Sequence, residues 1–314
     1  MNLQTKISLG KQSEDQIDYN SNVLLFGSCF SENIGKKLDY FKFKNSQNPF
    51  GILFHPKAIE TLISNAVDSK HFSEEDVFFH NEQWACFDAH SKLSHTSKDT
   101  LINQLNEQID LTNSKLKSAS HIIITLGTAW VYREISTNNI VANCHKVPQK
   151  QFKRELLSVE EITASLKQIL SLIRSVNYTA SVIFTVSPIR HTKDGFVANT
   201  QSKAHLITAI HQVISNQSFY FPSFEIMMDE LRDYRFYQED MVHPSQLAIN
   251  YIWDKFKMVW ISDQSFKTME EVEVVQKGLQ HKPFNIKSEA HQKFLQNLEV
   301  KISRLQIQFP YIVF

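Results

Sequence analysis

The stretch NVLLFGSCFSENIGKKLD, residues 22–39, decides the fold of this chain. Its apolar residues 23–26 are typical of a buried strand, and they stop at Gly27. A hydroxyl and a thiol follow at once, at Ser28 and Cys29, and a helix-like segment begins there. The stretch therefore predicts a strand that turns into a helix and carries two potential nucleophiles at the turn.

Other apolar runs along the chain have the same character. HIIIT at 121–125, SVIFTV at 181–186 and SFYFPSF at 218–224 predict further strands, and YFKF at 40–43 is a weaker candidate. Apart from SFYFPSF, the strong runs do not alternate with polar residues, which is typical of parallel strands covered on both faces.

Helical patterns lie between these strands. They span 56–67, 98–116, 158–176, 199–216 and 244–260. Strands that alternate with helices are typical of a doubly wound sheet. We therefore expect a three-layer α/β fold, in which about five mostly parallel strands lie between two layers of helices.

The alternation of strands and helices ends after about residue 262. We expect one main domain over residues 1–262, with insertions at about 68–97 and 131–157. Residues 263–314 are then a helical C-terminal appendage.

Within the appendage, residues 286–308 predict a single amphipathic helix. Its apolar stripe consists of Phe294, Leu295, Leu298, Ile302 and Leu305. Such a stripe needs cover, so the helix should pack on the main domain or on a second copy of the chain. A homodimer through this helix is therefore one alternative.

The charge balance excludes some classes of partner. Lys plus Arg and Asp plus Glu both number 33, so the net charge is zero and nothing favours nucleic acid or a membrane surface. The three cysteines lack the spacing of a disulfide scaffold. The sequence has neither a signal peptide nor an apolar run of about 20 residues. We expect a soluble, cytoplasmic protein.

The turn after the first strand is a candidate site because sites in open α/β sheets form beyond the carboxyl ends of strands. A helix N-terminus lowers the pKa of a thiol, which favours a thiolate at Cys29. The alternative is that Ser28 only caps the helix and Cys29 is only a small core residue.

A second candidate lies in the segment YRFYQEDMVHPS, at Asp240 and His243. Because the two residues are three positions apart, the carboxylate can hold the imidazole Nδ1–H and leave Nε2 free to face a nucleophile. The pair follows the last strand candidate and precedes a helix, where a loop can reach the first strand.

Further polar residues lie at the predicted strand ends or in the loops beyond them. They are His145, Ser187, Arg190, His191, Asn199 and Lys203. They predict a polar, partly basic pocket for a sugar hydroxyl or an anionic group, since the planar fork of Arg binds carboxylate and phosphate well.

Zinc is a weaker interpretation of the same residues. Cys29, Cys144, His145, His191 and His243 are of ligand type, but no two have the short spacing of a zinc site. We therefore predict no metal and no cofactor.

Several segments together resemble the GSCFA family, a branch of the SGNH/GDSL hydrolase superfamily. FGSCFSENIG matches the motif that names the family. The other matching segments are NPFGILF at 48–54, TLGTAWVY at 125–132, ANCHKVP at 142–148, FTVSPIRHTKDGF at 184–196, NTQSKAHL at 199–206 and YFPSFEIMMDELRDYRFYQEDMVHPS at 220–245. The resemblance covers roughly residues 20–262.

The resemblance implies a Cys-His-Asp triad. Members of the superfamily carry their nucleophile in a G-D-S motif after the first strand, which puts Cys29 at the position of the serine. A shift of one residue makes Ser28 the nucleophile instead. His243 is then the general base, and Asp240 orients it.

The resemblance also implies an oxyanion hole. The N–H groups of Cys29 and Gly51 fit two of its donors. The third block of the superfamily normally reads G-x-N-D, and its Asn is missing here. Thr128 or Asn48 is the candidate replacement, and one lost donor costs on the order of 10²–10³ in rate.

These residues imply an esterase that acts through a covalent acyl-enzyme on the acyl ester of a carbohydrate or small molecule. One alternative is an O-acyltransferase for a bacterial polysaccharide, which uses the same triad. Another is a non-catalytic ligand-binding protein whose site has drifted.

Overall fold

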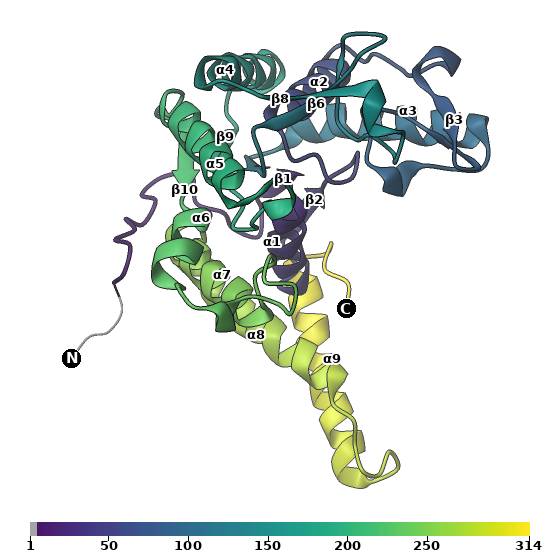
Figure 1. Cartoon of the computed structure of the whole chain (residues 1–314). Coiled ribbons are helices and arrows are strands. Elements are labelled where there is room, and N and C mark those ends of the chain that lie inside the picture. The colour runs from purple at the N-terminus through teal and green to yellow at the C-terminus, as the bar shows by residue number, and fades with distance from the viewer. Residues whose placement is uncertain (1–4) are drawn as a thin grey trace.

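The computed structural model describes residues 5–314, and its centre is a five-stranded sheet (Figure 1). The strands are β1 (Asn22–Gly27), β2 (Lys44–Gln47), β5 (His121–Leu126), β9 (Ser181–Val186) and β10 (Ser218–Phe221). All pair in parallel, in the order β10-β9-β5-β1-β2. This is the flavodoxin-like order, so the expected doubly wound fold is confirmed.

Helices cover both faces of this sheet. On one face lie α1 (Cys29–Tyr40) and α7 (Gln246–Trp260). On the other lie α2 (Pro56–Val67), α3 (Lys98–Ser118), α4 (Val159–Val176) and α5 (Phe196–His211). The side chains of a strand point alternately to the two faces. Accordingly Val23 and Leu25 pack in the core under α1, and Leu24 and Phe26 pack in the opposite core.

The two expected insertions form small sheets of their own. β3 (Phe78–His80) and β4 (Gln83–Ala85) make a hairpin, and β6 (Trp130–Glu134), β7 (Ile140–Val141) and β8 (Phe152–Leu156) make an antiparallel sheet. The short helical segments are η1 (Glu74–Asp76), η2 (Ser91–Leu93), η3 (Gln149–Gln151), η4 (Thr192–Asp194), α6 (Ser223–Glu225), η5 (Ile226–Glu230) and η6 (Tyr234–Phe236).

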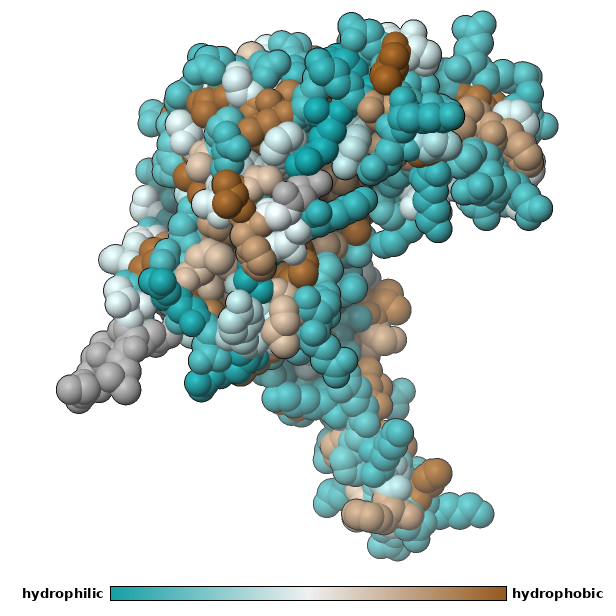
Figure 2. Space-filling model, in the orientation of Figure 1, coloured by the Kyte–Doolittle hydropathy of each residue, from teal (hydrophilic) through white to brown (hydrophobic). Residues whose placement is uncertain are grey.

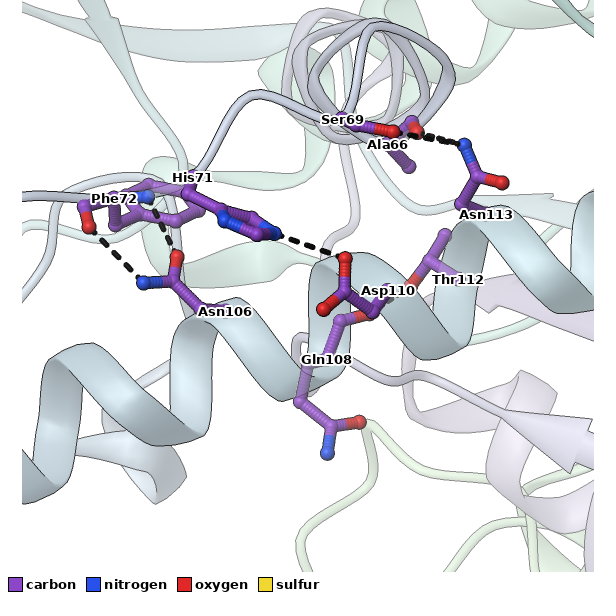
Figure 3. A network of polar contacts seen from close by, with 9 residues as sticks. All are labelled: Ala66, Ser69, His71, Phe72, Asn106, Gln108, Asp110, Thr112 and Asn113. Atoms are coloured by element: carbon purple, nitrogen blue, oxygen red, sulfur yellow. Dashed lines mark hydrogen bonds and ion pairs between the residues drawn. The ribbon is translucent and has the colours of Figure 1, made fainter.

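Polar side chains of α3 hold the chain that follows α2 (Figure 3). The Asn106 amide bonds both the N–H and the C=O of Phe72, and Asp110 bonds His71. Asn113 donates to the carbonyl of Ala66. These contacts fix the start of the first insertion against the main domain.

The predicted strand at 40–43 is wrong. α1 continues through Tyr40, and Lys42 has a φ of +62°, which makes a turn. The strand follows at 44–47 with the polar sequence KNSQ. β2 is an edge strand with all four residues half-buried, so it needs no apolar run. The search for an apolar run therefore placed the strand too early in the sequence. The predicted helix at 199–216 also differs, since α5 begins at Phe196 and ends at His211.

The expected C-terminal helix is present as α9 (Glu289–Gln308), and it forms a hairpin with α8 (Asp263–Gln280). Leu298 and Leu305 are buried against Val272 and Val275 of α8. Two residues of the predicted stripe, Phe294 and Leu295, remain 37% and 41% exposed. The hairpin projects from the main domain, and apolar residues lie on its surface (Figures 1 and 2). None of the helices in the described part of the chain is both long and apolar enough to cross a membrane.

Gly27 allows the turn that ends β1. Its φ is +130°, and a Cβ built there would lie 2.1 Å from the carbonyl oxygen of Thr125 on β5. Gly195 also has a positive φ, of +96°, but a Cβ built on Gly195 would have no other atom within 4 Å. Substitution of Gly195 would therefore introduce backbone strain alone, whereas substitution of Gly27 would introduce strain and a steric clash.

We predict that Gly27→Ala destabilises the fold by more than about 4 kcal/mol, because strain and clash act together. Gly195→Ala, which adds only strain, should cost about 1–3 kcal/mol. Urea unfolding followed by circular dichroism measures both. Equal losses for the two variants would contradict the role given to the Thr125 contact.

Candidate active site at the carboxyl edge of the sheet

Ser28 is fully engaged in the turn between β1 and α1. Its N–H donates to the carbonyl of Thr125 at 3.0 Å, and its Oγ accepts from the N–H of Phe30 at 3.2 Å. The residue is 1% exposed and is the N-cap of α1. Capping thus accounts for the Ser28 hydroxyl and leaves Cys29 as the better candidate nucleophile.

Cys29 occupies the first position of α1 and is half-buried. Its backbone N–H has no carbonyl partner among the described residues, as is usual in a first helical turn. Burial raises the pKa of the Cys29 thiol, against the opposing effects of that N–H and of the Lys203 and Lys92 charges. The direction of this pKa shift is opposite to the one expected for a thiolate, because the effect of desolvation is larger than that of the backbone N–H at the helix terminus.

Asp240 and His243 form the expected pair. Nδ1 of His243 lies 2.6 Å from Oδ2 of Asp240, and Oδ1 accepts from the N–H groups of Val242 and His243 at 2.9 Å each. These bonds, first those from the two backbone N–H groups, lower the pKa of Asp240 to about 2. The carboxylate is thus ionised at neutral pH and holds Nδ1–H, so that Nε2 is the free nitrogen.

The expected hydrogen bond between Cys29 and His243 is absent from the described residues. Both groups nevertheless belong to the same edge of the sheet. Cys29 follows β1, and the backbone N–H of Arg190, which follows β9, donates to the carbonyl of Val242 at 3.3 Å. The His243 side chain is 43% exposed, so its Nε2 is accessible from solvent.

The expected oxyanion donors differ in their availability. The N–H of Gly51 already donates to the carbonyl of Asn48 at 2.8 Å, and the hydroxyl of Thr128 bonds Ser202 at 3.0 Å. Asn48 is different: its Oδ1 accepts from the N–H of Gly27 at 2.9 Å, while its Nδ2 is buried without a partner. Of the three, Asn48 therefore has the free donor beside the turn.

Lys203 is buried beneath the edge. Its Nζ donates to the carbonyls of Gly127 at 2.7 Å and Ser187 at 2.8 Å, and so it joins the ends of β5 and β9. Burial lowers its pKa to about 7, although Cys29 acts in the opposite direction. Ser187 is itself 0% exposed. Lys203 and Ser187 are thus buried groups that hold the ends of β5 and β9 together.

His191 lies close to the end of β5, next to Gly127. Burial first, and then the Lys203 and His243 charges, lower its pKa to about 3, so the ring is neutral at physiological pH. Its Nε2 is buried without a partner, close to Gly127 and Phe54. Asn199 accepts from the backbone N–H of His191 at 2.8 Å and so positions it. Phe54, whose residue type gives no chemical signal in the sequence, also belongs to this edge, because its backbone carbonyl accepts from the N–H of Gly127.

His145 does not fit the expected role in substrate binding. Its Nε2 lies 2.7 Å from the carbonyl of Cys86 and 3.0 Å from that of Ala89, and Nδ1 lies 3.5 Å from the Ser94 hydroxyl. Both ring nitrogens are therefore occupied within the insertions. Within residues 5–314 no group of three His, Cys, Asp or Glu side chains is placed to hold a metal ion.

Family models match most of the chain. The model described as "GSCFA family" matches residues 22–256, and the one described as "GSCFA domain protein, C-terminal domain" matches residues 272–314. The resemblance inferred from the sequence is thereby confirmed. No curated protein matches the chain.

Solved structures with a similar arrangement include two esterases. One is a carbohydrate esterase family 3 from Talaromyces cellulolyticus, with 10% identity, a TM-score of 0.37, and coverage of 81% of this chain and 99% of that one. The other is the acetyl xylan esterase Est2A from Butyrivibrio proteoclasticus, with 10% identity, a TM-score of 0.41, and coverage of 84% and 66%.

We predict that iodoacetamide alkylates Cys29 before the other cysteines, at a rate that rises as the pH is raised above neutrality. Burial raises the pKa of Cys144 to about 11 and that of the buried Cys86 well above its usual range. Only Cys29 has a free helix N–H and two lysines to oppose burial. Peptide mass spectrometry over a pH series measures the three rates.

Cys29→Ser is the control, and it should remove the fastest alkylation phase. A rate at Cys29 that is already maximal at neutral pH would show a resting thiolate and contradict the prediction.

Proposed function

The chain belongs to the GSCFA family, and we propose that it is an ester hydrolase that forms a covalent acyl-enzyme on Cys29. The observation that carries this proposal is the pair of unused donors at the turn, the N–H of Cys29 and Nδ2 of Asn48. Hydrogen-bond donors beside a nucleophile are what a tetrahedral intermediate of acyl transfer needs.

In the first step, the Cys29 sulfur attacks the ester carbonyl while Nε2 of His243 takes the thiol proton. The raised pKa of Cys29 makes this general base necessary, because little thiolate is available at neutral pH. Asp240 holds Nδ1–H and stabilises the imidazolium that forms. This step requires the Cys29 sulfur and Nε2 of His243, which are not hydrogen-bonded in this structure, to come within reach when the ester binds, because catalytic hydrogen bonds often tighten only in the complex.

The tetrahedral oxyanion is held by the N–H of Cys29 and by Nδ2 of Asn48. The neutral His191 ring, whose buried Nε2 lies near Gly127 at the end of β5, is a further group at this edge of the sheet. Collapse of the intermediate breaks the C–O bond, and His243 returns its proton to the leaving alcohol. Water then attacks the thioester with His243 again as base, which releases the acid and restores the thiol.

A cavity next to the turn supports a polar alcohol as the leaving group. It has a volume of about 400 Å³. Its lining includes Glu32, Lys36, Asn48, Gly51 and Lys92. Charged and amide groups of this kind hydrogen-bond hydroxyls, so a small molecule or a carbohydrate fits better than a long acyl chain.

We predict that the protein hydrolyses p-nitrophenyl acetate, and that Cys29→Ser and His243→Ala each lower kcat/KM by about 10²–10⁴-fold. Ser28→Ala should affect catalysis less, since Ser28 only caps α1, at a stability cost of about 0.5–2 kcal/mol. Steady-state kinetics, with thermal unfolding of each variant, measure both effects.

An inactive Ser28→Ala with an active Cys29→Ser would move the nucleophile by one residue. Wild-type protein that neither turns over esters nor transfers acetyl from acetyl-CoA to glycan acceptors would contradict the enzyme and favour a ligand-binding protein.

We also predict that Asn48→Asp lowers kcat by about 10²–10³-fold without unfolding the protein. Aspartate keeps the oxygen that accepts from Gly27 and tolerates the φ of +44° at this position, but it removes the Nδ2 donor and adds a negative charge. Thr128→Val, which removes a hydroxyl already bonded to Ser202, is the comparison. A larger kcat loss in Thr128→Val would give the donor role to Thr128.

A further inference from the structure

We infer that Arg190 is a positioning residue that fastens the histidine loop, residues 240–243, to the end of β9. This inference rests on the proposed function of His243, but its central contacts are independent of any reaction. The sequence alone suggested substrate binding for this arginine, and the geometry assigns its guanidinium to the loop instead.

Arg190 contacts two successive residues of the histidine loop. Its backbone N–H donates to the carbonyl of Val242 at 3.3 Å, and its Nη2 donates to the carbonyl of Met241. Met241 has a φ of +57°, an uncommon conformation for a residue with a side chain. A backbone in such a conformation persists only when surrounding contacts hold it, and Arg190 provides one such contact at the carbonyl of Met241.

Aromatic rings hold the guanidinium in place. Its carbon lies 4.3 Å from the ring centre of Tyr237, 5.5 Å from that of Tyr234 and 5.7 Å from that of Phe196. A guanidinium at these distances is attracted to the ring faces. The stem of the histidine loop is fixed here too, because Tyr237 pairs with Pro244, and Gln238 donates to the carbonyl of His243 at 2.8 Å.

The fastened loop in turn sets the Asp240–His243 pair. Oδ1 of Asp240 accepts from the N–H groups of Val242 and His243, the former being the residue whose carbonyl Arg190 holds. If the peptide at 241–242 rotates, these bonds weaken and the imidazole loses its orientation. Arg190 thus acts on His243 through the backbone and not by direct contact.

Among the residues whose side chains the structure describes, no carboxylate forms a salt bridge with Arg190, and its Nε is buried without a partner. Arg235 pairs with Asp233 at 3.0 Å, and Arg232 lies 3.9 Å from Asp229 with 74% of its side chain exposed. Arg232, an exposed arginine in the segment that precedes the histidine loop, therefore offers a control of the same residue type.

The test compares Arg190→Ala, Arg190→Lys and Arg232→Ala in the full chain. Kinetics on p-nitrophenyl acetate give kcat and KM separately, and hydrogen–deuterium exchange reports the amides of residues 241–243 without any substrate. Arg190→Ala should lower kcat on the order of 10²-fold with KM little changed, since misplacement of a catalytic group by about 1 Å has this effect.

In Arg190→Ala, exchange at residues 241–243 should also rise while the strands keep their protection. Guanidinium ion at a sub-denaturing concentration should restore part of kcat. Arg190→Lys, which keeps a donor but loses the planar stack, should be intermediate, and Arg232→Ala should match wild type in both measurements.

Three results would overturn the inference. Unchanged exchange at 241–243 in Arg190→Ala would show that the loop does not depend on the arginine. A rise in KM alone, with unchanged exchange, would make Arg190 a substrate contact. If Arg232→Ala changed kcat and amide exchange as much as Arg190→Ala does, both effects would come from the loss of a positive charge and not from the contacts of Arg190. If wild-type protein lacks esterase activity, the proposed function fails, and the exchange measurement still decides the role of Arg190.

Discussion

The contact between Gly27 and Thr125 is the constraint on which the site depends. The two residues are partners in the β1–β5 ladder, and the absence of a Cβ lets the backbones approach. The carbonyl of Thr125 then accepts from the N–H of Ser28, and its hydroxyl bonds Ser31 at 2.7 Å. One strand residue thus sets where α1 begins, and the start of α1 sets the direction of Cys29.

Two opposing effects determine the pKa of the Cys29 thiol. A helix N-terminus stabilises a thiolate, whereas burial stabilises the thiol, and neither can be read from the motif in isolation. Here burial is the larger effect, and Glu32 in the first turn of α1 acts in the same direction. Under the proposed mechanism, the Cys29 thiol therefore needs a general base, as a serine hydroxyl does.

Local patterns in the sequence predicted most of the sheet and part of the site. Buried strands such as β5 and β9 are continuous apolar runs, and the Asp240–His243 contact spans three residues, so both are visible in a short window. β2 was misplaced because an edge strand needs no apolar run. The contacts of Arg190 and Lys203 could not be predicted from the sequence. Both side chains donate to backbone carbonyls that are distant in sequence, and every residue type carries such a carbonyl.

The end of the chain covers residues that are synthesised first. The ring of Phe309 stacks on Tyr19 at 4.8 Å, Tyr311 donates to the carbonyl of Tyr19 at 2.6 Å, and Ile312 is 1% exposed in the same core. Figure 1 shows the C-terminal segment returning beside α1 and β2. Because Tyr19 and Tyr311 are 292 residues apart, a ribosome that adds about 5–20 residues per second needs roughly 15–60 s to supply the cover. During that interval Tyr19 lacks its aromatic neighbours from the C-terminal segment, so this part of the core is completed only after residues 309–312 have been made.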